Sequence, residues 1–64
     1  MKTYYKVETR ITDRSARIFH AGEVQAEHRP QNTAVESAHV DIYEDFFCTF
    51  EEADLFVRTQ RRCL

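Results

Sequence analysis

The side chains in this chain that could perform chemistry are cysteines, histidines and a run of carboxylates. The cysteines and histidines are Cys48, Cys63, His20, His28 and His39. They show neither C-x-x-C nor H-x-x-x-H spacing, so the sequence predicts no metal site. A catalytic pair of Cys48 with His39 would need a thiolate, and the acidic residues around Cys48 disfavour that charged form. We therefore expect no catalytic residue, no metal and no cofactor, and we do not expect an enzyme.

The carboxylates form the most distinctive pattern in the chain. Between Pro30 and Val57 there are seven acidic residues and no lysine or arginine, although the whole protein has a net charge of only −2. Carboxylates spread over a small rigid body attract a basic partner. We interpret six of the acids as partner-binding residues, with an aromatic anchor among them. The acids are Asp41, Glu44, Asp45, Glu51, Glu52 and Asp54, and the anchor is Tyr43.

A second group of charged residues leads to a different interpretation. Basic residues gather in the segment 2–17, namely Lys2, Lys6, Arg10, Arg14 and Arg17, and Tyr4 could stack on a base. A basic two-stranded ribbon can enter the major groove of DNA. The alternative function is therefore a nucleic-acid-binding accessory protein, although a pI of about 5.8 is low for such a protein. A solvated acidic side without any specific partner is a third interpretation of the same charges.

Elements that would position these residues follow from the hydrophobic pattern. Residues 3–11 alternate between two faces, which predicts a half-buried strand. A loop at 12–15 leads to a second strand at 16–27, in which Gly22 interrupts the alternation and predicts a bulge. Pro30 ends any strand before it.

The segment 34–47 allows two interpretations. Period-two alternation places Ala38, Val40 and Ile42 on one side of a strand, whereas Thr33 and Glu36 match the capping box of a helix. The β-branched and aromatic residues from 40 to 47 favour the strand. A helix from 50 to about 62 follows, because Thr49 and Glu52 form a second capping box before an amphipathic stripe.

These elements predict one α+β domain over residues 1–64. It has a three-stranded antiparallel sheet and one C-terminal helix packed on one face, in the order β-β-β-α. The face with Tyr4, Lys6, Glu8 and Arg10 is expected to be exposed. Open sheet edges and a small core favour self-association, for example as a homodimer. The predicted core consists of Tyr5, Val7, Ile11, Ile18, Val40, Ile42, Phe46, Phe50, Ala53, Phe56 and Val57.

The cellular location is inferred from what the sequence lacks. The N-terminus has no apolar segment typical of a signal peptide, and no apolar run is long enough for a membrane span. We expect a cytoplasmic protein that does not interact with membranes. Cys48 and Cys63 are then reduced thiols, although their spacing does not exclude a disulfide between them.

One stretch resembles known proteins. The run VDIYEDFFCTFEEADLFV is similar to a strand, short loop and T/S-x-E-E-A helix found in small accessory proteins of phages and mobile elements. Some proteins of that size are anti-CRISPR or other anti-defence inhibitors. The resemblance implies a stoichiometric inhibitor that occludes a basic site on a host protein or complex through the segment 36–54. It transfers no functional residue to this chain.

Overall fold

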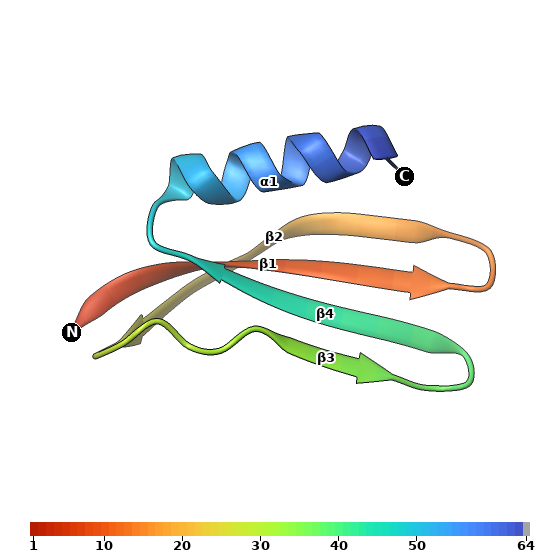
Figure 1. The fold of residues 1–64 in the computed structure, drawn as a ribbon, viewed down its shortest axis with the longest axis horizontal. Helices are drawn as coiled ribbons and strands as arrows, with labels where there is room; N and C mark the ends of the chain where they lie inside the picture. Colours follow the sequence, from red (N-terminus) through yellow and green to blue (C-terminus); the bar gives the residue numbers. More distant parts are fainter. Residues whose placement is uncertain (64) are drawn as a thin grey trace.

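Hydrophobic alternation and one capping box produce four strands and one helix. The computed structural model describes residues 1–63 (Figure 1). The elements are β1 (Lys2–Thr12), β2 (Ala16–Ala26), β3 (Thr33–Glu36), β4 (Val40–Phe47) and α1 (Phe50–Cys63). The strands form one antiparallel sheet in the order β2-β1-β4-β3, and α1 covers one face of it. The α+β class with a C-terminal helix is confirmed, but the sheet has four strands rather than three.

The extra strand comes from the segment that allowed two interpretations. Thr33 and Glu36 are the ends of β3, so they do not cap a helix. Ser37 closes the hairpin to β4, because its backbone N–H and its hydroxyl both donate to the Val40 carbonyl, at 3.1 Å and 2.7 Å. The single strand predicted over residues 34–47 is therefore two strands separated by a turn at 37–39, and its second part is β4.

A bulge separates the two halves of the β1–β2 pair. Tyr5 pairs with Glu23 and Val7 with His20, so two steps along β1 match three steps along β2. Gly22 has a φ of 101°, a left-handed conformation that residues with a Cβ avoid. The bulge predicted at Gly22 is confirmed, and it increases the local twist of the sheet.

The core lies between α1 and the sheet. Val7, Ile18, Ala53 and Val57 are at most 4% exposed and form one cluster. Aromatic contacts extend this cluster toward the start of the helix, where Tyr5 meets Phe50 edge-on at 6.0 Å and Phe47 meets Phe56 at 5.1 Å between ring centroids. The cap predicted at Thr49 is present, because its hydroxyl accepts from the Glu52 N–H at 3.1 Å.

Part of the predicted core is wrong. Val7 pairs with Asp45, and Tyr5 with Phe47, so the odd-numbered side chains of β4 face the helix. The three β4 residues predicted in the core lie instead on the opposite face, and two further residues are too exposed to belong to it. The first group is Val40, Ile42 and Phe46; the second is Ile11 (36% exposed) and Phe50 (51%).

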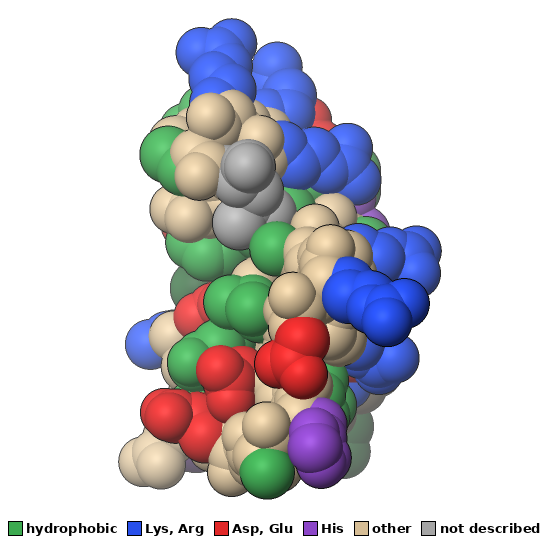
Figure 2. Space-filling model, turned by 90° about the vertical axis from the view of Figure 1, so that its right-hand side faces the viewer, with side chains coloured by type: hydrophobic (Ala, Val, Ile, Leu, Met, Phe, Trp, Pro, Cys, Tyr) green, Lys and Arg blue, Asp and Glu red, His purple; other side chains and the backbone are tan. Residues whose placement is uncertain are grey.

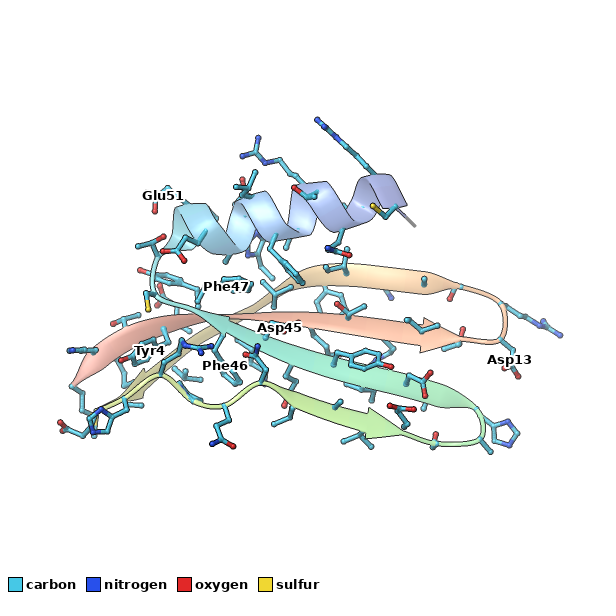
Figure 3. The ribbon with its side chains drawn as sticks, in the orientation of Figure 1. Tyr4, Asp13, Asp45, Phe46, Phe47 and Glu51 are labelled. Atoms are coloured by element: carbon cyan, nitrogen blue, oxygen red, sulfur yellow. The ribbon has the colours of Figure 1, made fainter. Side chains whose placement is uncertain are left out.

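Tyr4 also departs from the expectation, because it is only 6% exposed on the face away from the helix. Its cross-strand neighbour is Val24, and Phe46 lies near it at the same end of the sheet (Figure 3). The side chains of Arg29 and Asn32 bind the backbone of Phe46 at 3.2 Å and 3.0 Å. A second, smaller apolar cluster therefore lies on the face that the sequence predicts to be exposed.

Candidate functional site

The two faces of the sheet carry opposite charge. Successive side chains of a strand point to opposite faces, so the strand pairing assigns every strand residue to one face. We call the face beneath α1 the helix face and the other the open face. The four strand cations all point to the open face; they are Lys2, Lys6, Arg10 and Arg17. The helix face has no lysine or arginine on any strand, and it carries the acids Glu23, Glu36, Asp41 and Asp45.

Part of the helix face is uncovered. α1 packs over β2 and β1 and reaches β4, but its described residues do not contact β3 (Figure 1). This leaves a floor that we call the acidic shelf, made of Glu36, Asp41, Tyr43 and Asp45. Glu36 is paired with Asp41 across the strands, and Asp45 lies on β4 below the helix (Figure 3). Figure 2 shows acidic side chains gathered toward the lower left and basic ones along the top and right.

The electrostatics of the shelf follow from this crowding of carboxylates. Partial burial raises the pKa of the Tyr43 hydroxyl, and the negative charges of Glu36 and Asp41 raise it further. Partial burial also raises the pKa of Asp45. Within residues 1–63, no hydrogen bond or ion pair reaches the Asp45 carboxylate. Among the residues that the structure describes, the shelf is therefore a negative surface without its own counter-ions.

Glu44 does not belong to the shelf, although the sequence predicted it as partner-binding. It points to the open face, where its carboxylate lies 2.7 Å from the Lys6 ammonium and accepts from the Thr33 hydroxyl at 3.0 Å. The hydrogen bonds from Lys6 and Thr33 lower the pKa of Glu44. Its charge is already paired, so it attracts a basic partner only weakly.

The three helix acids predicted as partner-binding are also away from the shelf or already engaged. Glu52 interacts with Thr49 in the cap, and Glu51 is exposed beside it (Figure 3). Asp54 lies on the β2 side of α1, where it contacts His20 and Arg58, each at 3.1 Å. Of the predicted partner-binding residues, only Asp41, Tyr43 and Asp45 lie together on the shelf.

Glu36 is the shelf residue that sequence reasoning did not select. It lies in the acidic segment, but the sequence pattern does not place it in the partner-binding set. Its place depends on the pairing of β3 with β4, which brings it opposite Asp41. The sequence does not predict this pairing, because Thr33 and Glu36 also match the capping box at the start of a helix.

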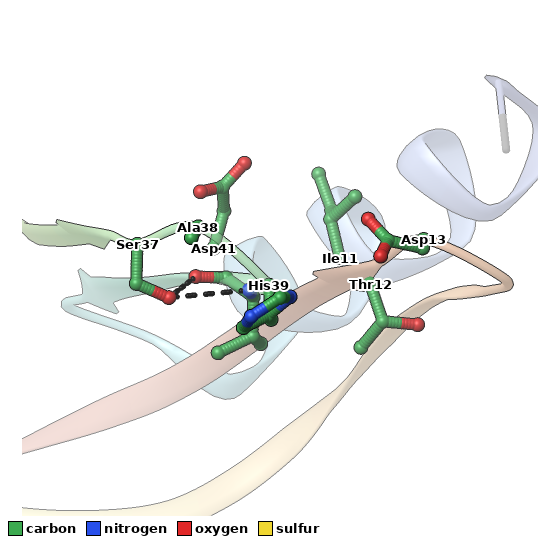
Figure 4. Close-up of a pocket in the computed structure, with 8 residues that line it drawn as sticks. Ile11, Thr12, Asp13, Ser37, Ala38, His39 and Asp41 are labelled. Carbon is green, nitrogen blue, oxygen red and sulfur yellow. Dashed lines mark hydrogen bonds between the residues drawn. The ribbon is translucent and has the colours of Figure 1, made fainter.

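A shallow pocket lies between the two hairpin turns, beside the end of the shelf (Figure 4). Its volume is about 100 Å³, which is well below the roughly 300 Å³ or more of typical small-molecule sites. In the described part of the chain, no three His, Cys, Asp or Glu side chains gather as metal ligands. The pocket is lined by Ile11, Thr12, Asp13, Ser37, Ala38, His39, Val40 and Asp41.

Cys48 and Cys63 are free and exposed, so the structure contains no disulfide between them. Among residues 1–63, no helix has the length and apolar character that crossing a membrane requires.

Comparisons with known proteins add no family, since no family model, curated protein or solved structure matches the chain.

Proposed function

We propose that this protein is a non-enzymatic binding module that occludes a basic surface of a protein partner with its acidic shelf. The observation that carries the proposal is the separation of charge between the two sheet faces. The shelf acids Glu36, Asp41 and Asp45 share a face on which no strand contributes a cation. Their charges are therefore available to a partner rather than neutralised within the fold.

The shelf also has the composition of a binding surface. Tyr43 is half-buried between the acids and offers an aromatic ring that loses little conformational entropy on binding. α1 packs over β2 and β1 beside the shelf and also contacts β4 (Figure 1). Charge attraction at such a surface accelerates association, and salt weakens it.

Nucleic-acid binding remains a second candidate because of one observation. All four strand cations point to the open face, and Arg17 lies over the ring of Phe19 at 5.6 Å. Two of these cations are already paired, Lys6 with Glu44 and Arg10 with Glu8 at 2.8 Å. Tyr4 is buried and therefore cannot stack on a base. These contacts favour the acidic shelf as the main binding surface.

The test is an affinity pulldown from a lysate of the source cells, with and without nuclease and at low and high salt. We expect a nuclease-resistant protein partner that high salt releases. The variant Glu36→Lys with Asp41→Lys should lose the partner at low salt, by about tenfold or more in affinity, because both charges of the shelf edge are reversed.

A control with the same change in net charge is Glu23→Lys with Glu27→Lys, since both residues are exposed and lie off the shelf. It should keep the partner. Loss of the partner in both double variants would contradict the shelf as the binding surface. The pulldown could instead recover nucleic acid, and Lys6→Glu with Arg10→Glu could abolish that recovery. This result would replace protein binding by the shelf with nucleic-acid binding by the open face.

A further inference from the structure

The β3 edge of the sheet has free backbone groups that point away from β4. Ser37 bonds to Val40, and the Phe46 backbone bonds to Asn32, so the even-numbered β4 residues direct their N–H and C=O groups toward β3. Their partners on β3 are Thr33 and Val35. Because the groups of a strand alternate in direction, those of Ala34 and Glu36 point outward, and no hydrogen bond in the described structure uses them.

The opposite edge of the sheet is protected. The Ile18 carbonyl on β2 accepts from two guanidinium nitrogens of Arg61, at 3.3 Å and 3.2 Å. The bulge at Gly22 interrupts the same strand four residues later. Coverage by a helix and β-bulges are among the means by which natural sheets prevent strand addition at an edge. Within residues 1–63, the short β3 edge has no bulge and no side-chain hydrogen bond to the backbone of Ala34 or Glu36.

The side chains on β3 define what would pair with it. Val35 points to the open face and is 61% exposed, which suits an apolar side chain opposite. Glu36 points to the helix face beside Asp41, which suits a basic side chain. Ala34 is small and lies beside Tyr43, so a long basic side chain opposite it can extend across the tyrosine ring.

We infer that an extended segment of the partner, with alternating basic and apolar residues, adds to the β3 edge as a fifth strand. Its basic side chains lie over the acidic shelf, and its apolar side chains cover Val35. This inference rests on the proposed function, because it names the form in which the basic partner reaches the shelf. Backbone bonds to Ala34 and Glu36 supply affinity, and the charge pattern supplies specificity.

A second copy of this chain is a poorer occupant of the edge. Pairing two β3 strands would join two acidic shelves edge to edge, and both would bring Glu36 and Asp41 without a cation. Like charges placed together across an interface cost free energy. A basic segment removes that repulsion and complements the shelf.

The test uses amide hydrogen exchange of the whole protein, measured by NMR. The probe is the blocked peptide acetyl-Thr-Arg-Val-Arg-Val-Arg-Thr-amide. Adding it should slow exchange at Ala34 and Glu36 by about tenfold or more, because their outward N–H groups become bonded. Thr33 and Val35 should change less, since β4 already binds them. A peptide with glutamate in place of arginine should give no protection.

A proline substitution isolates the backbone contribution. Ala34→Pro removes an outward N–H and no bond to β4, which an edge strand tolerates. It should weaken peptide binding about tenfold, whereas Ala16→Pro at the start of β2 should leave binding unchanged. Circular dichroism shows whether each variant is folded. If Ala34→Pro unfolds the protein, the hydrogen-exchange measurement on the wild type is sufficient to test strand addition at β3.

The outcomes separate this inference from the proposed function. One outcome is that Glu36→Lys with Asp41→Lys loses the partner, while the peptide slows exchange at neither Ala34 nor Glu36. This outcome would support the shelf as the binding surface and would contradict strand addition. Protection that appears without peptide and grows with protein concentration would assign the edge to a second copy and also overturn it. Equal protection by the glutamate peptide would overturn the basic pattern. Failure of both experiments would remove both proposals.

Discussion

At the scale of single residues, Asp45 shows how binding and stability can conflict. It lies half-buried on the helix face, directly opposite Val7, where an apolar side chain would pack better against the core. Burial raises its pKa, and no cation of the described fold compensates its charge. An ionised carboxylate kept in such a place is a candidate for a functional role, because it lowers stability without benefit to the fold.

We predict that Asp45→Asn stabilises the protein at pH 7 and weakens partner binding. In the folded state the pKa of Asp45 lies above its ordinary value of 3.8. The wild type therefore loses stability as the pH rises from about 3.8 through the raised pKa of Asp45. Asparagine does not ionise, so its advantage should disappear below about pH 3.8, where the carboxyl is protonated in both states. Urea unfolding at several pH values measures this, and a pH-independent difference between variant and wild type would contradict it.

At the scale of elements, the bulge in β2 and the short β3 determine which edge is open. Gly22 allows β2 to bend, and Arg61 then covers the Ile18 carbonyl from α1. The hairpin of β3 and β4 is closed by Ser37, and within the described residues the helix contacts β4 but not β3. One edge is thus protected by local geometry and a long-range contact, whereas the other stays available.

We predict that Gly22→Ala destabilises the protein by about 1–2 kcal/mol through backbone strain alone. A Cβ at this position would meet no atom within 4 Å, so steric clash plays no part. Gly22→Asn should cost less, because asparagine tolerates a positive φ better than alanine. Thermal unfolding of the three proteins compares them. A Gly22→Ala protein as stable as the wild type would mean that the bulge can form without a positive φ.

At the scale of the whole molecule, the helix and sheet depend on one small core. Only Tyr4, Val7, Ile18, Ala53 and Val57 are buried among the described hydrophobic residues, and four of them lie where α1 meets β1 and β2. In the described structure, the other apolar cluster, around Tyr4 on the open face, is smaller. We therefore expect helix and sheet to unfold together in one transition.

We predict that Val57→Ala lowers the free energy of unfolding by about 2 kcal/mol, because it removes two methyl groups from a fully packed site. Val57 is 1% exposed, so little of this loss can be recovered by solvation. Helical circular dichroism and tyrosine fluorescence should report the same midpoint in urea. Two separate midpoints would contradict the single core. Val35→Ala is the matched control, and its exposed side chain should make the change small.

Much of the local structure was determined by the sequence itself. The alternation from Thr3 to Ile11, the interruption at Gly22 and the cap at Thr49 each depend on neighbouring residues, so short-range sterics and hydrogen bonds suffice to predict them. The acidic segment was equally visible as a local excess of charge.

Only the tertiary structure decided which side chains share a face. The pairing of Val7 with Asp45 turned Phe46 away from the helix and Asp45 toward it, and the pairing of Glu36 with Asp41 completed the shelf. A one-residue change in register reverses the face of every side chain in a strand, and register is set by contacts between residues distant in the sequence. The same long-range pairing moved Glu44 to the open face, beside Lys6. The sequence therefore predicts the acidic and basic segments, but it does not predict that their charges separate onto two faces of the sheet.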